Sequence, residues 1–245
     1  MTLPPLVKGT DWDRGYLNPV TGEFAPSVTT ILKVIHKKEL DGWAARMAAD
    51  YAVKNWDELS GCGDAMRRDQ IKSAPEVYTT QKADLGTAVH EVADRWMKGI
   101  PSEETKETSS YISQFIRFLA EFKPRFTGTE ATVWSRRDEY AGTADIFAVI
   151  DGENWLIDIK TGKGIYPEHG LQLAALANAE FRILPDGTEL ELPRFDEWAV
   201  LHLRPRGWKL VPIREKEACH SAFLGAREIF RFLNETAEHV LGEPL

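Results

Sequence analysis

Two aspartates and a lysine interrupt an otherwise apolar stretch, YAGTADIFAVIDGENWLIDIKTGK at residues 140–163. Asp145, Asp158 and Lys160 stand where a buried sheet would carry Val or Leu. Burying such charged groups without partners costs several kcal/mol of folding free energy, and a bound divalent cation can offset this cost. Carboxylate oxygens are the ligands that Mg²⁺ and Mn²⁺ prefer. These residue types therefore predict a site for Mg²⁺ or Mn²⁺.

The same stretch reads as two strands joined by a hairpin turn at residues 151–154. Symmetric folding about that turn predicts three opposed pairs: Val149 with Leu156, Phe147 with Asp158, and Asp145 with Lys160. Side chains alternate along a strand and opposed residues share a face, so the three charged groups are expected on one face. The alternative is that the Asp-Ile-Lys tripeptide lies at a frayed strand end and faces water. A second Asp on the same face weighs against that alternative.

The elements that must position these residues follow from the periodicity of the apolar residues. Residues 15–32 indicate an irregular hairpin or extended arm, after which Ser27 can cap a short helix. The predicted helices are residues 39–56, 81–98, 109–123, 168–181 and 216–239, and the predicted strands are residues 129–135, 141–150, 155–160, 195–203 and 208–213. The C-terminal helix is expected to turn Ala222, Ala226, Ile229 and Leu233 inward. This order favours an α/β fold, a central mixed β-sheet flanked by helices with an N-terminal helical elaboration.

The bulk composition allows one domain and excludes several classes of protein. The 245 residues can form a single domain, with a core at about residues 81–215, an N-terminal arm and helices at 1–80 and a C-terminal helix at 216–245. No window is apolar enough for a membrane span, and the N-terminus lacks the pattern of a secretory signal, so we expect a cytoplasmic protein. Two distant cysteines exclude a self-contained zinc ribbon or four-cysteine iron–sulfur cluster.

The net charge of -8 argues against a sequence-independent DNA coat. It does not argue against an enzyme that acts on DNA, because carboxylates around a metal add to the acidic count. The basic pairs could still line a groove: Lys37-Lys38, Arg67-Arg68, Arg136-Arg137 and Arg204-Arg206.

His90 lies on the helix predicted at residues 81–98. The apolar stripe of that helix is Leu85, Val89, Val92 and Trp96, and beside it runs a row of Gly86, His90, Ala93 and Met97. The small residues of this row would let the helix approach the sheet closely. His90 could be a core histidine with satisfied hydrogen bonds or a ligand that faces the charged end of the sheet.

Four motifs in order resemble the PD-(D/E)XK nuclease superfamily, and within it the RecB-like branch that includes phage exonucleases. The family pattern is a histidine on a helix, G-x-x-D on one strand, D-x-K on the next strand and a glutamine on the following helix. The matching residues are His90, Gly142 to Asp145, Asp158-Ile159-Lys160 followed by Thr161-Gly162-Lys163, and Gln172. The resemblance covers roughly residues 25–180 and implies a restriction-endonuclease-like core.

The resemblance also implies a role for each residue. Asp145 and Asp158, with His90 and the carbonyl of Ile159, would hold one or two Mg²⁺ or Mn²⁺ ions. Lys160 would orient or activate the attacking water and stabilise the charge of the transition state. The remaining implied positions are Glu130 and Gln172, which support the catalytic groups, and Thr161, Lys163, Tyr166 and again Gln172, which contact the substrate. The family usually has a tyrosine four residues after the glutamine, where this chain has Leu176, and Tyr166 is the available substitute.

Two other enzyme classes lack an essential residue. A zincin needs a second histidine at the position of Asp94, and an ATP-driven motor needs a complete phosphate-binding loop that the sequence does not contain. A nuclease-like binding module without catalysis is disfavoured because every core catalytic position holds the expected residue type.

The resulting expectation is a Mg²⁺- or Mn²⁺-dependent DNA exonuclease of phage or bacterial recombination or repair. An endonuclease with the same catalytic centre is the first alternative, and a catalytically inactive binding domain is the second. The expected partners are DNA and a single-strand annealing protein or another recombination factor, without a membrane.

Overall fold

The computed structural model describes residues 6–7, 15–37, 40, 42–184 and 186–243. Contacts within the chain define two compact units, one of residues Met1–Ile35 and Val89–Leu245 and the other of His36–Ala88. The single domain expected over residues 1–245 stays a prediction. Within the described ranges, no helix combines the length and apolarity that a membrane span needs.

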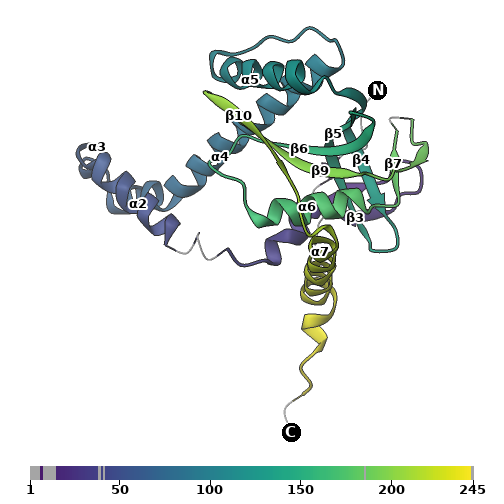
Figure 1. Cartoon of the computed structure of the whole chain (residues 1–245). Helices are drawn as coiled ribbons and strands as arrows, with labels where there is room; N and C mark the ends of the chain where they lie inside the picture. The colour runs from purple at the N-terminus through teal and green to yellow at the C-terminus, as the bar shows by residue number, and fades with distance from the viewer. Residues whose placement is uncertain (1–5, 8–14, 38–39, 41, 185, 244–245) are drawn as a thin grey trace. The chain divides into compact units, whose positions relative to one another are not determined.

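A mixed sheet is the centre of the larger unit (Figure 1). Among the described residues its strand order is β10-β9-β6-β5-β4-β7-β8. The bounds are β4 Arg125–Ser135, β5 Tyr140–Ile150, β6 Glu153–Lys160, β7 Phe181–Ile183, β8 Glu189–Glu191, β9 Glu197–Arg204 and β10 Gly207–Pro212. Only the pair of β6 and β9 is parallel, and the other pairs are antiparallel. The predicted α/β class, with a mixed sheet flanked by helices, is confirmed.

Helices cover both faces of this sheet. On one face α1 (Val28–Ile31), α6 (Pro167–Ala177) and α7 (Lys216–Arg231) enclose a core that includes Phe147, Leu156 and Val200. On the other face α5 (Lys106–Phe122) packs its buried aromatic residues against β10, where Phe118 makes an edge contact with Trp208. Strands buried on both faces need apolar residues at nearly every position, which explains the near-continuous apolar run of β5.

The N-terminal arm forms a small three-stranded sheet of β1 (Leu6–Val7), β2 (Gly15–Leu17) and β3 (Phe24–Pro26). Asn18 stabilises the turn between β2 and β3 by accepting from the N–H groups of Val20 and Thr21. Ser27 caps α1 by accepting from the Thr30 N–H, as predicted, and the short 3-10 helix η1 (Leu32–Val34) follows.

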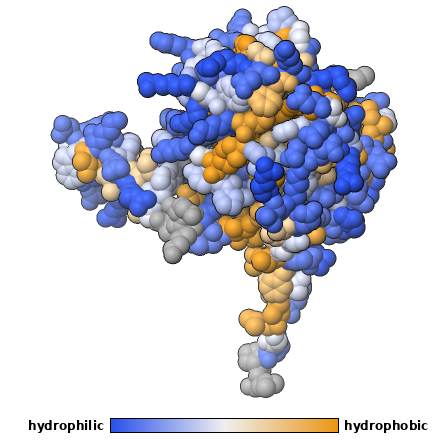
Figure 2. All heavy atoms as spheres, in the orientation of Figure 1, coloured by the Kyte–Doolittle hydropathy of each residue, from blue (hydrophilic) through white to orange (hydrophobic). Residues whose placement is uncertain are grey.

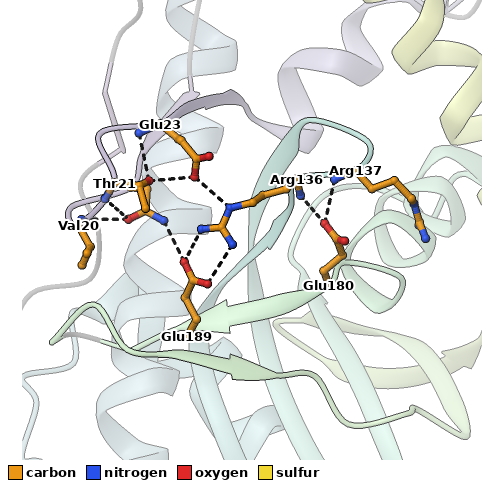
Figure 3. A network of polar contacts seen from close by, with 8 residues as sticks. Val20, Thr21, Glu23, Arg136, Arg137, Glu180 and Glu189 are labelled. Carbon is orange, nitrogen blue, oxygen red and sulfur yellow. Dashed lines mark hydrogen bonds and ion pairs between the residues drawn. The ribbon is translucent and has the colours of Figure 1, made fainter.

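Arg136, in the turn between β4 and β5, connects this arm to the end of the sheet (Figure 3). Its guanidinium donates to Glu23 at 3.0 Å and to Glu189, the first residue of the edge strand β8. Glu180 accepts from the backbone N–H groups of both Arg136 and Arg137. The Arg136 guanidinium is therefore committed to contacts within the protein, whereas whether the pair Arg136-Arg137 lines a DNA groove stays untested.

The structure corrects two predicted helix ends in this unit. The helix predicted at residues 168–181 ends at Ala177, and Phe181 begins β7. The helix predicted at residues 216–239 is α7 only as far as Arg231, and a π-helix η3 (Phe232–Thr236) and a 3-10 helix η4 (Ala237–His239) follow. Periodicity alone could not separate these segments, because they continue the same helical pattern.

The predicted inward stripe of the C-terminal helix is also wrong in part. Ala226 is buried, but Ile229 and Leu233 are 53% and 55% exposed. Phe223, Arg227 and Phe230 are buried instead. Figure 2 shows the resulting apolar surface along the C-terminal segment. The two large aromatic rings decide which face of α7 packs, because they bury more apolar area than Ile229 or Leu233 can.

The smaller unit consists of α2 (Trp43–Lys54), α3 (Trp56–Ser60) and the first part of α4 (Asp64–Met97). The helix predicted at residues 39–56 is shorter than expected, because Gly42, with φ of 68°, precedes α2. Glu39 and Asp41 lie outside the described residues. α4 begins well before the predicted residue 81 because residues 64–80 are helical around Pro75. Arg67 donates to the carbonyl groups of Leu59 and Cys62, which fixes the end of α3. Lys38 of the predicted basic pair lies outside the described residues.

Candidate active site

The hairpin of β5 and β6 brings the two aspartates together through a shorter turn than the sequence suggested. Asp151 and Gly152, with φ of 50° and 88°, form a two-residue turn of the kind that suits an Asp-Gly pair. Val149 therefore opposes Asn154, and Phe147 opposes Leu156. The predicted pairs of Val149 with Leu156 and of Phe147 with Asp158 were wrong by two residues. Because side chains alternate with period two, a shift of two residues leaves every side chain on its predicted face.

Asp145 lies directly beyond the end of the β5–β6 ladder, whose last pair is Ile146 with Ile157. Asp145 is 8% exposed as a residue, and its carboxylate accepts from the Ile159 N–H at 2.6 Å. Burial opposes ionisation, but the charge of His90, a hydrogen bond from His90 and the charge of Lys160 together hold the pKa of Asp145 below its usual value. Asp145 is therefore ionised at neutral pH.

Asp158 and Lys160 follow on β6 at alternate positions and share a face. Lys160 Nζ lies 2.6 Å from one carboxylate oxygen of Asp158 and donates to the other at 2.8 Å. Gln172, on α6, donates to the same second oxygen at 3.0 Å. Burial outweighs the attraction of Lys160 and raises the pKa of Asp158 to about 6, whereas the two aspartates outweigh burial and raise the pKa of Lys160. Lys160 is accordingly charged.

His90 enters from α4 and faces the other aspartate. Its Nε2 donates to the Ile159 carbonyl at 2.9 Å, while Nδ1 lies 3.5 Å from Asp145 and 3.8 Å from Glu130. Burial works against a charge on the ring, but Asp145 and Glu130 raise the pKa of His90 well above its usual value. His90 is thus an imidazolium held between two carboxylates when no metal is bound.

Glu130 reaches this cluster through an irregular position in β4. Its φ of 46° lies in the left-handed region, which costs a residue with a side chain about 1 kcal/mol or more. Burial, together with the charges of Asp145 and Asp94, raises the pKa of Glu130 despite its hydrogen bond to His90. Backbone strain at a cluster of acidic groups is typical of a functional site.

The donor set fits a divalent metal ion. One potential ligand atom from each of His90, Glu130 and Asp145 lies within 4.8 Å of the others. Carboxylate oxygens with one imidazole suit Mg²⁺ or Mn²⁺, and Mn²⁺ accepts the nitrogen ligand more readily. Three of the four predicted ligands meet at Ile159, since its N–H contacts Asp145 and its carbonyl contacts His90. The fourth, Asp158, bonds to Lys160 and Gln172 instead, and Glu130 completes the group with His90 and Asp145.

The glycine of the G-x-x-D motif has a steric explanation. A Cβ atom on Gly142 would lie 2.6 Å from Leu176 of α6 and 3.1 Å from Val28 of α1. The absence of a side chain therefore lets α6 pack closely enough for Gln172 to reach Asp158. Leu176 itself is buried, so the position where the resembling family often has a tyrosine belongs to the core here.

Three of the four predicted substrate-contacting residues, Thr161, Lys163 and Tyr166, lie on the loop after β6, whereas Gln172 lies on α6 and bonds to Asp158. Lys163 is exposed and Tyr166 is 46% exposed, with its ring edge against His169. The Thr161 carbonyl accepts from Arg204 at 3.2 Å. Within the described part of the chain, none of these three side chains bonds to the carboxylates, and their contact with a substrate stays a prediction.

Sequence reasoning missed the side chains that fix this loop. His202 lies beside Lys160 in the parallel register and donates through Nε2 to the Gly162 carbonyl at 2.8 Å. Arg204, on the same strand, donates to the carbonyls of Thr161 and Gly162. The available signal was a His and an Arg at alternate positions of an apolar strand, the same pattern that identified Asp158 and Lys160. The Arg204 guanidinium therefore holds this loop, and whether the pair Arg204-Arg206 also lines a DNA groove stays untested.

Comparisons with known proteins add little to this geometry. No protein-family model matches the chain, and a search of curated proteins found no match. Among solved structures, an alkaline exonuclease (LHK-Exo) from Laribacter hongkongensis superposes with a TM-score of 0.32 at 13% identity, covering 63% of this chain and 86% of that chain. A protein designated SSO0001 superposes with a TM-score of 0.32 at 16% identity, covering 85% of each chain. At these TM-scores neither likeness bears on function.

Proposed function

We propose that this chain is a Mg²⁺- or Mn²⁺-dependent deoxyribonuclease of the RecB-like PD-(D/E)XK type. The observation that carries the proposal is the Lys160–Asp158 ion pair of 2.6 Å beside a separate cluster of His90, Glu130 and Asp145. A purely structural ion pair gives no reason for three further titratable groups to gather beside it, two of them bonded to the backbone of Ile159. Buried charges of this density are typical of catalytic sites.

Each candidate residue has its own role in phosphodiester hydrolysis. Asp145, Asp158, His90 and the Ile159 carbonyl would hold the ion, and Glu130 would support His90. The ion, when bound, supplies an acidified water and positive charge beside the phosphate oxygens. Lys160 orients the attacking water and places its ammonium where negative charge develops in the transition state. Gln172 keeps the Asp158 carboxylate oriented, and Lys163, Thr161 and Tyr166 contact the DNA backbone.

The finer proposal is an exonuclease that acts in phage or bacterial recombination or repair, in the cytoplasm, with DNA as substrate. A single-strand annealing protein or another recombination factor is the proposed protein partner. An endonuclease would use the same catalytic groups, so only the form of DNA that is cut separates the two activities.

The test is digestion of end-labelled linear duplex, linear single strand and closed circular DNA, each with Mg²⁺, Mn²⁺ or EDTA. The proposal predicts metal-dependent loss of linear DNA, intact circles and no loss with the Lys160→Ala protein. Cleavage of circles would replace the exonuclease by an endonuclease. Absence of cleavage under every condition would contradict the nuclease proposal and favour a binding module.

A further inference from the structure

A row of basic side chains crosses three neighbouring strands at one end of the sheet. The strands β6, β9 and β10 lie side by side in the sheet (Figure 1). Lys160 of β6 stands next to His202 of β9 in the parallel register, and His202 stands opposite Lys209 of β10 in the antiparallel register. Neighbouring positions of paired strands share a face. The row therefore begins at the candidate active site and leads to the edge strand β10.

The packing of nearby residues agrees with this shared face. Trp208, which precedes Lys209, contacts Phe118 of α5 on one side of the sheet. Val200, two residues before His202, belongs to the core on the other side, which α6 and α7 cover. Because side chains alternate along a strand, His202 and Lys209 both lie on the α6 side. This is the side from which α6 contacts the candidate active site.

The two segments that form this end of the sheet carry basic charge without acidic charge. Residues 159–167 (IKTGKGIYP) contain two lysines and no Asp or Glu. Residues 201–214 (LHLRPRGWKLVPIR) also contain no Asp or Glu, and their basic residues other than His202 are Arg204, Arg206, Lys209 and Arg214. The whole chain has 38 Asp and Glu against 30 Lys and Arg, so these segments reverse its overall balance. A local positive surface on an acidic protein attracts a phosphate backbone.

Three of these cations are available to a ligand. Lys163, Arg206 and Lys209 are exposed, and their side chains make no hydrogen bond or ion pair within the described part of the chain. Arg136, at the other end of the sheet, differs because Glu189 neutralises it. The charges of the first three residues are therefore not committed to holding the fold together.

The loop that carries Lys163 is fixed beside the middle of the row. His202 is 9% exposed and donates to the Gly162 carbonyl at 2.8 Å. Arg204 donates through Nη1 to the carbonyls of Thr161 and Gly162, while its Nε and Nη2 make no hydrogen bond within the described residues. A guanidinium presents five N–H donors, so Arg204 can hold the loop and a phosphate oxygen at once. A loop that is fixed before binding loses less conformational entropy when DNA binds.

We infer that Lys163, Arg204, Arg206 and Lys209 form a track that binds the phosphate backbone of one DNA strand and leads it to Lys160. The inference rests on the nuclease proposal, which makes Lys160 the end of the track. Two strand spacings separate Lys160 from Lys209, or about 10 Å, which spans about three nucleotides at about 3.4 Å of helix rise each. Phosphate contacts carry no base sequence, so the track binds DNA of any sequence.

The salt dependence of DNA binding tests the track. Binding of a fluorescent single-stranded oligonucleotide is measured by anisotropy in EDTA, so that metal-dependent cleavage does not contribute. The slope of log affinity against log salt concentration reports how many phosphates the protein neutralises. In the Arg206→Ala/Lys209→Ala protein this slope should become less negative by about 1.4, since each phosphate contact on a single strand contributes about 0.7.

A matched control removes the same two kinds of charge outside the track. The Lys106→Ala/Arg125→Ala protein loses one exposed lysine in the first turn of α5 and one exposed arginine at the start of β4. Arg125 pairs with Val149 beside the β5–β6 turn, at the opposite end of β6 from Lys160. The control should keep the slope of the unmodified protein.

Charge-specific variants separate DNA binding from a structural role of Lys209. A lysine on an edge strand also discourages pairing with another sheet, and that role does not depend on DNA. Lys209→Arg keeps the charge and should retain the slope, whereas Lys209→Glu should weaken binding more than Lys209→Ala does. Thermal unfolding verifies that each variant is folded. Folded Lys209→Ala and Lys209→Glu proteins that bind as the unmodified protein does would overturn the track.

The remaining outcomes separate this inference from the nuclease proposal. Equal slopes for the Arg206→Ala/Lys209→Ala protein and its control overturn the track, as does an unmodified protein that binds neither single-stranded nor duplex DNA. Metal-dependent cleavage together with equal slopes contradicts the track alone. Loss of slope without any metal-dependent cleavage contradicts the nuclease proposal and leaves the basic row as a DNA-binding surface.

Discussion

The carboxylate of Asp145 accepts a hydrogen bond from the backbone N–H of Ile159 at 2.6 Å, where the β5–β6 ladder has ended. The carbonyl of the same Ile159 accepts from His90 at 2.9 Å. One residue of β6 thereby connects a carboxylate of β5 to an imidazole of α4, and its two neighbours are Asp158 and Lys160. A backbone group cannot be repositioned by a rotamer change, so this connection fixes the candidate ligands before any ion binds.

Replacing His90 should weaken metal binding. His90→Ala removes one candidate ligand and leaves Asp145 and Glu130 in place, so Mn²⁺ affinity is expected to fall by about tenfold or more. Titration calorimetry with Mn²⁺ measures this directly. His239→Ala, an exposed histidine in η4, is the control and should bind Mn²⁺ as the unmodified protein does. Equal affinities for all three proteins would remove His90 from the ligand set.

Metal binding should strengthen as the pH rises. Mn²⁺ must displace the proton that the two carboxylates hold on His90, and Asp158, with its pKa raised to about 6, must also ionise. The apparent affinity is therefore expected to rise through about pH 6 and to continue rising toward the higher pKa of His90. Calorimetry in buffers of different ionisation enthalpy should detect released protons. An affinity that does not change with pH would contradict this protonation scheme.

The metal-free protein should lose stability as the pH rises above neutral. The pKa of His90 is raised by folding, so its charge contributes stability that is fully present below about pH 6.5 and is lost as the pH passes the folded-state pKa. Folding also raises the pKa of Asp158, so the stability that its proton contributes is lost at lower pH, as the pH rises from about 4 to about 6. Thermal unfolding in EDTA measures the first effect. His90→Gln should flatten the decline above pH 6.5, and an unchanged slope in that variant would assign the decline to other groups.

A side chain at Gly142 should destabilise the fold. In Gly142→Ala the new Cβ would meet Leu176 at 2.6 Å, which we expect to lower the free energy of unfolding by about 1–3 kcal/mol. Gly225→Ala is the matched control, because nothing lies within 4 Å of its new Cβ and the residue is inside α7. That change should raise the free energy of unfolding by roughly 0.5–1 kcal/mol. Urea denaturation compares the variants, and partial recovery in Gly142→Ala/Leu176→Ala would locate the clash.

Gln172 should act through the carboxylate that it orients. Gln172→Ala removes the 3.0 Å hydrogen bond to Asp158 while leaving Lys160 in contact. Loss of such a supporting contact is expected to reduce cleavage about 10–100-fold. Steady-state cleavage at several Mn²⁺ concentrations separates a loss of metal affinity from a loss of kcat. Unchanged cleavage at every concentration would show that Lys160 alone suffices to hold Asp158.

Residue alternation and motif order made much of the fold and the cluster accessible to sequence reasoning. Asp158 and Lys160 share a face because side chains alternate along a strand. The predicted hairpin register was wrong by two residues, and a shift by an even number of residues does not change which face a side chain occupies. The register itself required knowing that Asp151-Gly152 alone forms the turn, and the sequence offered a four-residue turn equally well. The helical spacing of apolar residues also continues from Ala177 to Phe181 and beyond Arg231. The helices α6 and α7 nevertheless end at Ala177 and Arg231, so apolar spacing alone does not mark their ends.

Other features depend on contacts between residues distant in the chain. Nothing near Glu130 in the sequence indicates its left-handed φ, and nothing near Gly142 indicates that Leu176 packs against it. The attachment of residues 161–162 to His202 and Arg204 requires the parallel pairing of β6 and β9, which the sequence analysis did not assign.

The most direct test of the central claim compares Lys160→Ala with Lys106→Ala in Mg²⁺- or Mn²⁺-dependent cleavage of linear DNA. Both changes remove a lysine side chain, but Lys106 is exposed in the first turn of α5 and lies outside the sheet. The account predicts that Lys160→Ala loses activity by on the order of 10²–10³-fold or more, while Lys106→Ala retains it. Full activity of a folded Lys160→Ala protein, with contaminating nuclease excluded, would contradict the account.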